Sequence, residues 1–196
     1  RGTSAFKLMN DLIVITGQTA TGKTKLAIDY ASRLEGELVN ADSRQVYKHL
    51  DIVTGKDKDE LKKSEIKVHL LDVVTPNQAF SSYDFVSLAE PIIQIIGKKK
   101  KTPIIVGGSY LYIKHLLYGQ SVKVAPNQKL RLSLEKLSVE QLQKKLLSID
   151  KSMNTKMNHS DWNNPRRLIR KIEIATASIR SNISDTSSML PALSYK

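Results

Sequence analysis

The sequence predicts an α/β fold, a parallel sheet with helices on both faces, followed by a basic helical region. Three observations support this prediction. Short apolar runs, typical of buried parallel strands, recur up to about residue 106. Apolar residues with helical spacing separate these runs. After Gly119 no convincing strand pattern follows, and only helical patterns remain.

The first strand and the first helix flank a glycine-bearing turn. Residues 12–16 form the apolar run of the strand. The apolar side chains that then recur with helical spacing are Leu26, Ala27, Tyr30, Ala31 and Leu34. Gly36 offers this helix a C-terminal cap. A second strand begins at Leu38, and polar residues 40–45 cut it short.

Two further strands and one helix complete the sheet region. We expect the strands at residues 68–74 and 104–106. Between them, a helix over about residues 83–96 begins after Ser81 and Asp84, which are spaced as a capping box.

The change of pattern near residue 120 gives the domain division. Residues 9–120 are expected to form the α/β core, and residues 121–160 a helical insertion. Residues 161–182 are expected to form a basic helix that returns to the core, and residues 183–196 an unassigned tail.

Two helix starts are marked in the second half of the chain. Ser138 and Gln141 have the spacing of a capping box. Asn164 is a suitable cap, and Pro165 fits the first helical position.

Composition excludes several classes of protein. The chain has 196 residues and no cysteine, which excludes disulfides, thiol nucleophiles and cysteine-ligated metals. No apolar run approaches the roughly 18 residues of a membrane span. We therefore expect a cytoplasmic protein with no membrane contact, and we expect a monomer.

The charge is unevenly distributed along the chain. Residues 1–96 carry 12 basic and 13 acidic residues, whereas residues 97–196 carry 19 basic and 6 acidic residues. Such asymmetry suggests that one half of the chain faces a polyanion. The alternative is a lysine-rich surface that is only solvated.

The octapeptide GQTATGKT matches the phosphate-binding pattern G-x-x-x-x-G-K-[ST]. Its residues are Gly17, Gln18, Thr19, Ala20, Thr21, Gly22, Lys23 and Thr24. The strand expected before it and the helix expected after it favour a P-loop NTPase-like fold over a chance match. Backbone amides of the loop would surround phosphate oxygens. Lys23 would reach the outer phosphates, and Thr24 would bind Mg²⁺.

A second polar motif, Asp42-Ser43-Arg44-Gln45, follows the second strand. It lies near the sheet edge where α/β proteins bind ligands. A carboxylate there could act as a base toward an acceptor group. The alternative is that Asp42 closes an Asx turn or caps a helix.

A second acid that would help to hold Mg²⁺ is not obvious. In NTPases another strand often ends in such an acid, but here residues 104–106 lead into Gly107, Gly108 and Ser109. Asp72 could supply the carboxylate, although a strand-end aspartate that caps a turn is the preferred interpretation.

Taken together, these blocks resemble the tRNA dimethylallyltransferase family. The blocks are GQTATGKT, NADSRQVYKHLDIVTGK, HLLDVVTP, VGGSYLYIKHLLYG and NNPRRLIRKIEI, in that order between Leu12 and Arg180. The resemblance implies transfer of the dimethylallyl group from dimethylallyl diphosphate to N6 of adenine 37, beside the anticodon of tRNA, with release of pyrophosphate.

The resemblance also assigns residues. The family's phosphate-binding segment falls on Gly17 to Thr24, and its catalytic aspartate on Asp42. Lys23 and Thr24 would stabilise the departing diphosphate together with Mg²⁺. The residues that would contact tRNA are Asp42, Ser43, Arg44, Gln45, Ser109, Arg131, Arg166, Arg167, Leu168, Ile169 and Arg170. Ser109 replaces the threonine that is usual in the family, and it keeps the hydroxyl.

The resemblance also includes a departure. Family members continue with a further helical segment that supplies a diphosphate-binding arginine, and nothing in this sequence matches it. We therefore expect that the family's C-terminal part is missing and that activity of the short chain needs a direct test. Two alternatives remain: a P-loop small-molecule kinase that uses ATP, and a non-catalytic RNA-binding remnant. Prenyl transfer to free adenine nucleotides is disfavoured because it needs no large basic surface.

Overall fold

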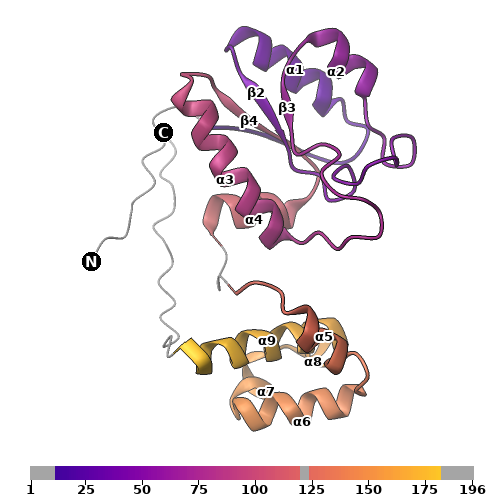
Figure 1. Ribbon diagram of the computed structural model, residues 1–196, viewed down its shortest axis with the longest axis vertical. Coiled ribbons are helices and arrows are strands. Elements are labelled where there is room, and N and C mark those ends of the chain that lie inside the picture. Colours follow the sequence, from indigo (N-terminus) through magenta and orange to yellow (C-terminus); the bar gives the residue numbers. More distant parts are fainter. Residues whose placement is uncertain (1–11, 120–123, 182–196) are drawn as a thin grey trace. The chain divides into compact units, whose positions relative to one another are not determined.

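The computed structural model describes residues 12–119 and 124–181, which form two compact units (Figure 1). The first unit is an α/β unit and the second is entirely helical. Each unit is described by itself. Among the described residues, no helix combines the length and the apolar character that crossing a membrane requires.

The α/β unit is built on a four-stranded parallel sheet. Its strands are β1 (Ile13–Thr16), β2 (Glu37–Asn40), β3 (Val68–His69) and β4 (Pro103–Gly107), in the order β1-β4-β2-β3. Thr16 pairs with Gly107, and Asn40 pairs with Val106. The carboxyl ends of β1, β4 and β2 are therefore level, and the turns that follow these strands meet at one edge of the sheet.

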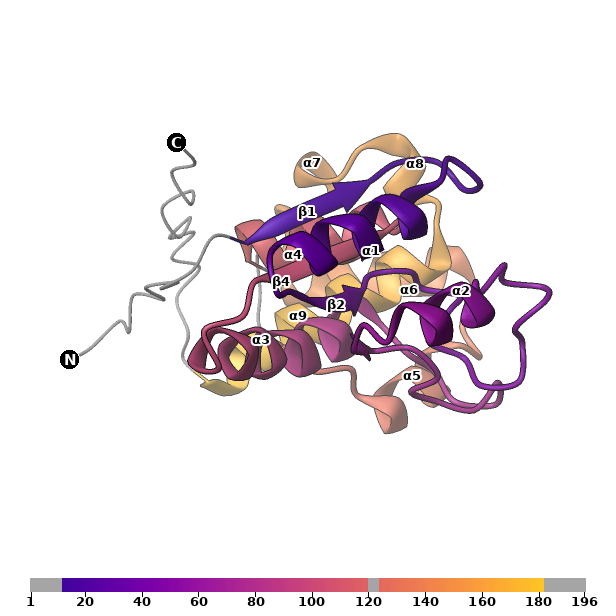
Figure 2. The same cartoon turned by 90° about the horizontal axis from the view of Figure 1, so that it is seen from above.

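Helices cover both faces of this sheet, as predicted. Helices α1 (Lys23–Arg33) and α2 (Lys58–Ser64) pack on one face, and α3 (Ser82–Lys98) and α4 (Tyr110–Tyr118) on the other. Figure 2 shows β1 and β2 pointing in the same direction with α1 across the sheet.

Each face of the sheet has its own apolar core, and alternate residues of the same strands point to opposite faces. Leu38 and Ile104 point to the α1 face, whereas their neighbours Val39 and Ile105 point to the α3 face. All four are fully buried. Because both faces are covered, the strands read as continuous apolar runs, and each such side chain contributes about 1.5–3 kcal/mol relative to exposure.

The predicted start of the third helix and the predicted cap at the end of the first helix are confirmed. Ser81 and Asp84 form the expected capping box of α3. At the end of α1, Glu35 adopts the left-handed conformation, and the N–H of Gly36 donates to the carbonyl of Ala31 over 2.8 Å. A Cβ on Gly36 would also lie 2.8 Å from the carbonyl oxygen of Thr102.

The buried face of α1 is narrower than predicted. Ala27 and Ala31 are buried against the sheet, whereas Leu26, Tyr30 and Leu34 are nearly half exposed. Small residues let the helix approach the strands closely, so the larger neighbours lie at its sides.

The strand expected over residues 68–74 ends at His69. Leu70 and Asp72 have positive φ angles of 59° and 56°, which break the extended conformation. The backbone N–H of Asp72 donates to the carbonyl of Gln45, and Val74 forms an isolated bridge with Tyr47. The apolar run is therefore a short strand followed by a segment that pairs with the chain after β2.

The helical unit consists of five short and medium helices. They are α5 (Gln128–Leu134), α6 (Val139–Ile149), α7 (Met153–Lys156), α8 (His159–Trp162) and α9 (Pro165–Ser181). The capping box of Ser138 and Gln141 is confirmed, as is the start of α9 at Pro165. The buried residues of its core are Leu134, Leu142, Leu146, Met157, Leu168, Ile169 and Ile172.

The segment predicted as a basic helix, residues 161–182, contains α9, which lies in the helical unit. Helix α9 packs against α5, α6 and α8, and it contributes three residues to the core that they share. It is part of the helical unit because its apolar face needs those neighbours. The predicted tail at residues 183–196 lies outside the described residues.

Candidate active site

The predicted phosphate loop connects β1 to α1 and is exposed. Ala20 and Gly22 have positive φ angles of 63° and 77°, and alternation of this kind turns backbone amides toward one side. Helix α1 begins directly after Gly22, without a side-chain cap and without an acidic residue in its first turn. Its N-terminal amides and partial positive charge are therefore available to an anion.

Two side chains fold back onto this loop. The hydroxyl of Thr21 donates to the carbonyl of Gln18 over 2.8 Å. The ammonium group of Lys23 donates to the same carbonyl and lies 3.4 Å from the Thr21 hydroxyl. The ammonium group of Lys23 thus lies against the phosphate loop, as its predicted contact with a bound phosphate requires.

Asp42 forms the Asx turn that was the alternative interpretation of this residue, and it keeps one oxygen for other partners. Its Oδ1 accepts the backbone N–H of Arg44 at 2.9 Å and that of Gln45 at 3.4 Å. Within the described residues, Oδ2 makes no hydrogen bond. A Cβ built on Gly108 would lie 3.8 Å from this Oδ2 and 3.4 Å from the carbonyl oxygen of Gly17. Gly108 therefore lies beside both this carboxylate and the beginning of the phosphate loop.

The end of β4 holds the Asp42 turn in place. A Cβ on Gly107 would lie 2.3 Å from the carbonyl group of Ala41, so only glycine fits there. The backbone N–H of Ser109 donates to the carbonyl of Ala41 over 3.1 Å, and the Ser109 hydroxyl accepts the N–H of Ser43 over 2.7 Å. Ser109 thus supports the turn, a role that the sequence did not indicate.

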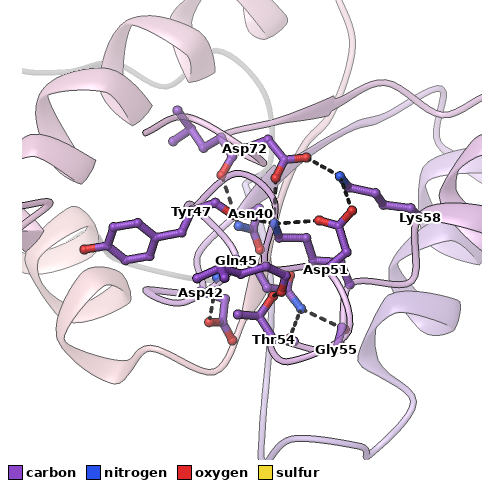
Figure 3. A network of polar contacts seen from close by, with 12 residues as sticks. Asn40, Asp42, Gln45, Tyr47, Asp51, Thr54, Gly55, Lys58 and Asp72 are labelled. Atoms are coloured by element: carbon purple, nitrogen blue, oxygen red, sulfur yellow. Dashed lines mark hydrogen bonds and ion pairs between the residues drawn. The ribbon is translucent and has the colours of Figure 1, made fainter. Parts of the chain in front are cut away.

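Gln45 connects the same turn to the loop at residues 50–56. Its side-chain amide donates to the carbonyls of Thr54 and Gly55 over 3.2 and 3.1 Å (Figure 3). Arg44 lies between Asp42 and Gln45 and is exposed. The amide donors of Gln45 therefore hold this loop.

A buried lysine holds the loop at residues 50–56 from its other end. The side chain of Lys56 is fully buried, and its ammonium group contacts the carbonyl of Tyr47, Asp51 Oδ1 and Asp72 Oδ1 at 2.5, 3.0 and 2.6 Å. Lys58 contacts Asp51 at 2.8 Å and Asp72 at 2.7 Å (Figure 3). This network joins the segments before and after the loop to the end of β3.

The network changes the interpretation of Asp72. Each of its carboxylate oxygens is paired with a lysine, so Asp72 neither caps a turn nor offers a free oxygen to Mg²⁺. Burial alone would raise the pKa of Asp72, but hydrogen bonds from Lys56 and Lys58 outweigh it and lower this pKa. No group of three histidine or acidic residues suitable for a metal occurs among the residues described.

In the helical unit, a buried glutamate holds two of the predicted tRNA-contacting arginines. The Glu173 side chain is 1% exposed. Arg131 donates to its two oxygens over 2.7 and 2.8 Å, and Arg170 donates over 3.1 Å. Arg170 also donates to the carbonyl of Val124. Burial would raise the pKa of Glu173, but hydrogen bonds from Arg131, the Asn127 N–H and Arg170 lower it.

The other residues of the predicted arginine-rich segment differ in accessibility. Arg166 is exposed and has no partner among the described side chains, whereas Arg167 pairs with Asp161. Leu168 and Ile169 are buried in the core of the unit. Their side chains therefore do not face solvent, and contact of this segment with tRNA stays a prediction.

Known proteins are similar to this chain over most of its length. The IPP transferase family model matches residues 45–192. The tRNA dimethylallyltransferase of Hydrogenobaculum sp. (strain Y04AAS1) is 44% identical over 168 residues, which cover 84% of this chain and 55% of that protein. That of Anoxybacillus flavithermus (strain DSM 21510 / WK1) is 44% identical over 83% of this chain and 51% of that protein. The chain thus spans about half the length of these curated relatives.

Solved structures agree with this assignment. The full-length tRNA isopentenylpyrophosphate transferase from Bacillus halodurans has a TM-score of 0.56 and 34% identity, over 85% of this chain and 55% of that one. A eukaryotic dimethylallyltransferase described as acting on tRNA has a TM-score of 0.69 and 28% identity, over 87% and 44%. From the family match and these relatives together, the chain belongs to the IPP transferase family.

Proposed function

We propose that this protein transfers a dimethylallyl group from dimethylallyl diphosphate to N6 of adenine 37 in tRNA. The observation that carries the proposal is the position of Asp42, whose Oδ2 has no partner among the described residues and lies beside Gly108, which also adjoins Gly17 at the start of the phosphate loop. A base and a diphosphate-binding loop at one edge of a sheet are what this reaction needs. The names of the relatives support the same reaction.

In the proposed reaction, Asp42 is the base. The exocyclic amine of adenine is a poor nucleophile because its lone pair is conjugated with the ring. The bond from N6 to C1 of the dimethylallyl group forms while the bond from C1 to the diphosphate oxygen breaks, and that electron pair leaves with the diphosphate. The N6 proton passes to Oδ2 of Asp42, which lowers the barrier. Oδ1 meanwhile stays bound to the turn.

The phosphate loop would stabilise the leaving diphosphate. The N-terminal amides of α1 and the ammonium group of Lys23 supply positive charge where negative charge develops. Thr24 fits a role as Mg²⁺ ligand because it lies in the first turn of α1 and its hydroxyl makes no hydrogen bond among the described residues. Mg²⁺, when bound there with phosphate oxygens and water, would neutralise part of the diphosphate charge.

The helical unit would supply much of the affinity for tRNA. Its described residues 124–181 include 12 basic and 5 acidic residues. Exposed basic side chains such as Arg166 would neutralise phosphates of the anticodon stem-loop. That the protein acts as a monomer in the cytoplasm stays a prediction.

A P-loop kinase that uses ATP is the competing enzyme class. Such an enzyme would need a second acid near the phosphate loop, in addition to Asp42, to help hold Mg²⁺. The strand beside β1 is β4, and it ends in Gly107, Gly108 and Ser109 without a carboxylate. Asp72 is committed to two lysines. These observations favour prenyl transfer.

The direct test is to incubate the chain with unmodified tRNA, labelled dimethylallyl diphosphate and Mg²⁺. We expect label in the tRNA and in N6-isopentenyladenosine after digestion. Replacement of adenine 37 by guanine should abolish incorporation. Binding of the stem-loop without incorporation would instead identify a non-catalytic RNA-binding remnant, and consumption of ATP with a small-molecule acceptor would identify a kinase.

A further inference from the structure

The loop at residues 50–56 presents two neighbouring apolar side chains to solvent. Ile52 is 96% exposed and Val53 is 82% exposed, the two highest values among the large apolar residues described. Surface apolar residues are common singly, but an adjacent pair at the tip of a loop is a candidate binding feature. Hydrophobic packing within the α/β unit does not explain these two side chains.

The loop is firmly held even though its tip is exposed. The N–H and hydroxyl groups of Thr54 donate to the carbonyl of Leu50 over 3.1 and 2.6 Å, and the N–H of Gly55 donates to the carbonyl of Ile52 over 3.2 Å. The buried ammonium group of Lys56 closes the loop against Asp51 and Asp72. Ile52 and Val53 are therefore displayed on an ordered turn, which lowers the entropic cost of inserting them into a partner.

The same loop is coupled to the catalytic turn. Gln45 donates to the carbonyls of Thr54 and Gly55, and Gln45 N–H also contacts Oδ1 of Asp42 (Figure 3). Gln45 thus joins the turn that holds Asp42, through its backbone N–H, to the residue that follows Val53, through its side chain.

The chemistry near the tip favours a nucleic acid as the partner. Arg44 and Lys48, on the segment between Asp42 and the loop, are exposed and basic. Asp51 and Asp72, the acidic residues of the network, are neutralised by Lys56 and Lys58. Exposed acids at residues 57, 59 and 60 follow the loop, so the positive charge lies on the segment that precedes it, next to Asp42. An apolar tip preceded by this positive charge fits a stacked base with a neighbouring phosphate.

We propose that Ile52 and Val53 form a wedge that enters the anticodon loop and occupies the stacking position that adenine 37 leaves when it moves to Asp42. This inference rests on the proposed function. A base inside a stacked loop must be extruded before its N6 can react, and extrusion costs stacking. Aliphatic side chains that replace the lost contacts would hold the open form. Gln45 is then a positioning residue that sets the distance from the wedge to the base.

The test uses an anticodon stem-loop RNA with 2-aminopurine at position 37. This base brightens when it unstacks, and it lacks the N6 amine, so it reports extrusion without transfer. We expect the wild-type chain to raise the fluorescence severalfold. The double variant Ile52→Ser, Val53→Ser should bind the RNA with similar affinity, measured by anisotropy, but produce little rise. Its transfer to unmodified tRNA should fall about tenfold or more, the factor that loss of one stacked base represents.

Two controls define the outcome. Ile95→Ser removes a 49%-exposed apolar side chain from the last turns of α3 and should change neither signal. Ile52→Leu, Val53→Leu keeps the apolar tip and should retain the rise. An undiminished rise in the serine variant would overturn the wedge, and so would a folded serine variant that loses only affinity. If the wild-type chain transfers label but gives no rise, the wedge fails while the proposed function stands. If the wild-type chain neither binds nor transfers, the proposed function fails first and the wedge fails with it.

Discussion

The candidate base of the α/β unit and the buried acid of the helical unit have opposite environments. Described residues 12–119 include 15 basic and 12 acidic residues, whereas residues 124–181 include 12 basic and 5 acidic residues. In the α/β unit, Asp42 keeps one oxygen unpaired at an exposed edge. In the helical unit, both oxygens of buried Glu173 are paired with arginines. The number of partners, more than the residue type, separates an acid available for chemistry from an acid that holds a scaffold.

The largest effect on stability is expected where the end of β4 meets the residue that follows β2. Gly107→Ala places a Cβ 2.3 Å from backbone atoms of Ala41, and neither backbone segment can easily move. We expect the unfolding free energy of this unit to fall by about 3 kcal/mol, the upper end of the usual range for overpacking. Thermal unfolding followed by circular dichroism measures it.

A matched control and a local probe sharpen this test. Gly97 lies in α3 with no atom within 4 Å of an added Cβ, so Gly97→Ala should stabilise the unit by about 0.5 kcal/mol. Trp162, the only tryptophan, packs in the helical unit, and its fluorescence transition should not move in either variant. A stable Gly107→Ala protein would show that the close approach of β4 to Ala41 is wrong.

A smaller effect is expected from Glu173→Gln in the helical unit. Glutamine can still accept one hydrogen bond, but the two arginines lose the buried charge that holds them together. We expect a loss of about 2 kcal/mol, below the 3–5 kcal/mol of a completely broken buried pair because Arg131 and Arg170 are partly exposed. Urea unfolding followed by Trp162 fluorescence measures it. Glu140→Gln, at an exposed acid in α6, is the control, and an equal loss there would remove the special role of Glu173.

The stability of the helical unit should depend on pH through the carboxyl group of Glu173. The pKa of Glu173 is lowered from its ordinary value of 4.5, since hydrogen bonds from the arginines outweigh burial. Its contribution is therefore fully present above pH 4.5 and is lost as the pH falls through the lowered pKa of the folded state. Trp162 unfolding curves should show stability falling below pH 4.5, and falling less in Glu173→Gln. Identical slopes in both proteins would contradict this assignment.

The smallest expected effects come from two arginines on α9, one of which should affect tRNA binding and the other the stability of the helical unit. Arg166→Ala should weaken tRNA binding and reduce the salt slope by about one, with unit stability unchanged, because its side chain is exposed and unpaired in the described region. Arg170→Ala should instead lower the stability of the helical unit, because Arg170 contacts Glu173 and Val124. Salt titrations of binding and Trp162 unfolding distinguish these outcomes. The reverse assignment would show that Glu173 does not hold Arg170 in place.

Local sequence patterns predicted features of both units. The phosphate loop, the capping boxes at Ser81 and Ser138, and the start of α9 at Pro165 are all defined within a few residues, so a single segment carries the information. The three turns that form the candidate site were also predicted, because parallel strands end at a common edge.

The missed features depend on contacts between distant segments. Arg131 and Glu173 are 42 residues apart, and His69 pairs with buried Glu37 over 32 residues. No local pattern marks these pairs. Helix α2 was not predicted because it has no buried residue of its own and lacks an apolar stripe. The brace from Gln45 to Thr54 was missed because a glutamine in a polar motif suggests ligand contact as readily as a loop support.

The most direct measurement of the central claim is the transfer rate of Asp42→Asn with unmodified tRNA and labelled dimethylallyl diphosphate. Asparagine keeps the oxygen that accepts the N–H groups of Arg44 and Gln45, so the turn should persist while the base is lost. The account predicts a rate lower by about 10²–10⁴-fold, with binding of tRNA and of diphosphate unchanged. Transfer at the wild-type rate, or loss of binding equal to the loss of transfer, would contradict it.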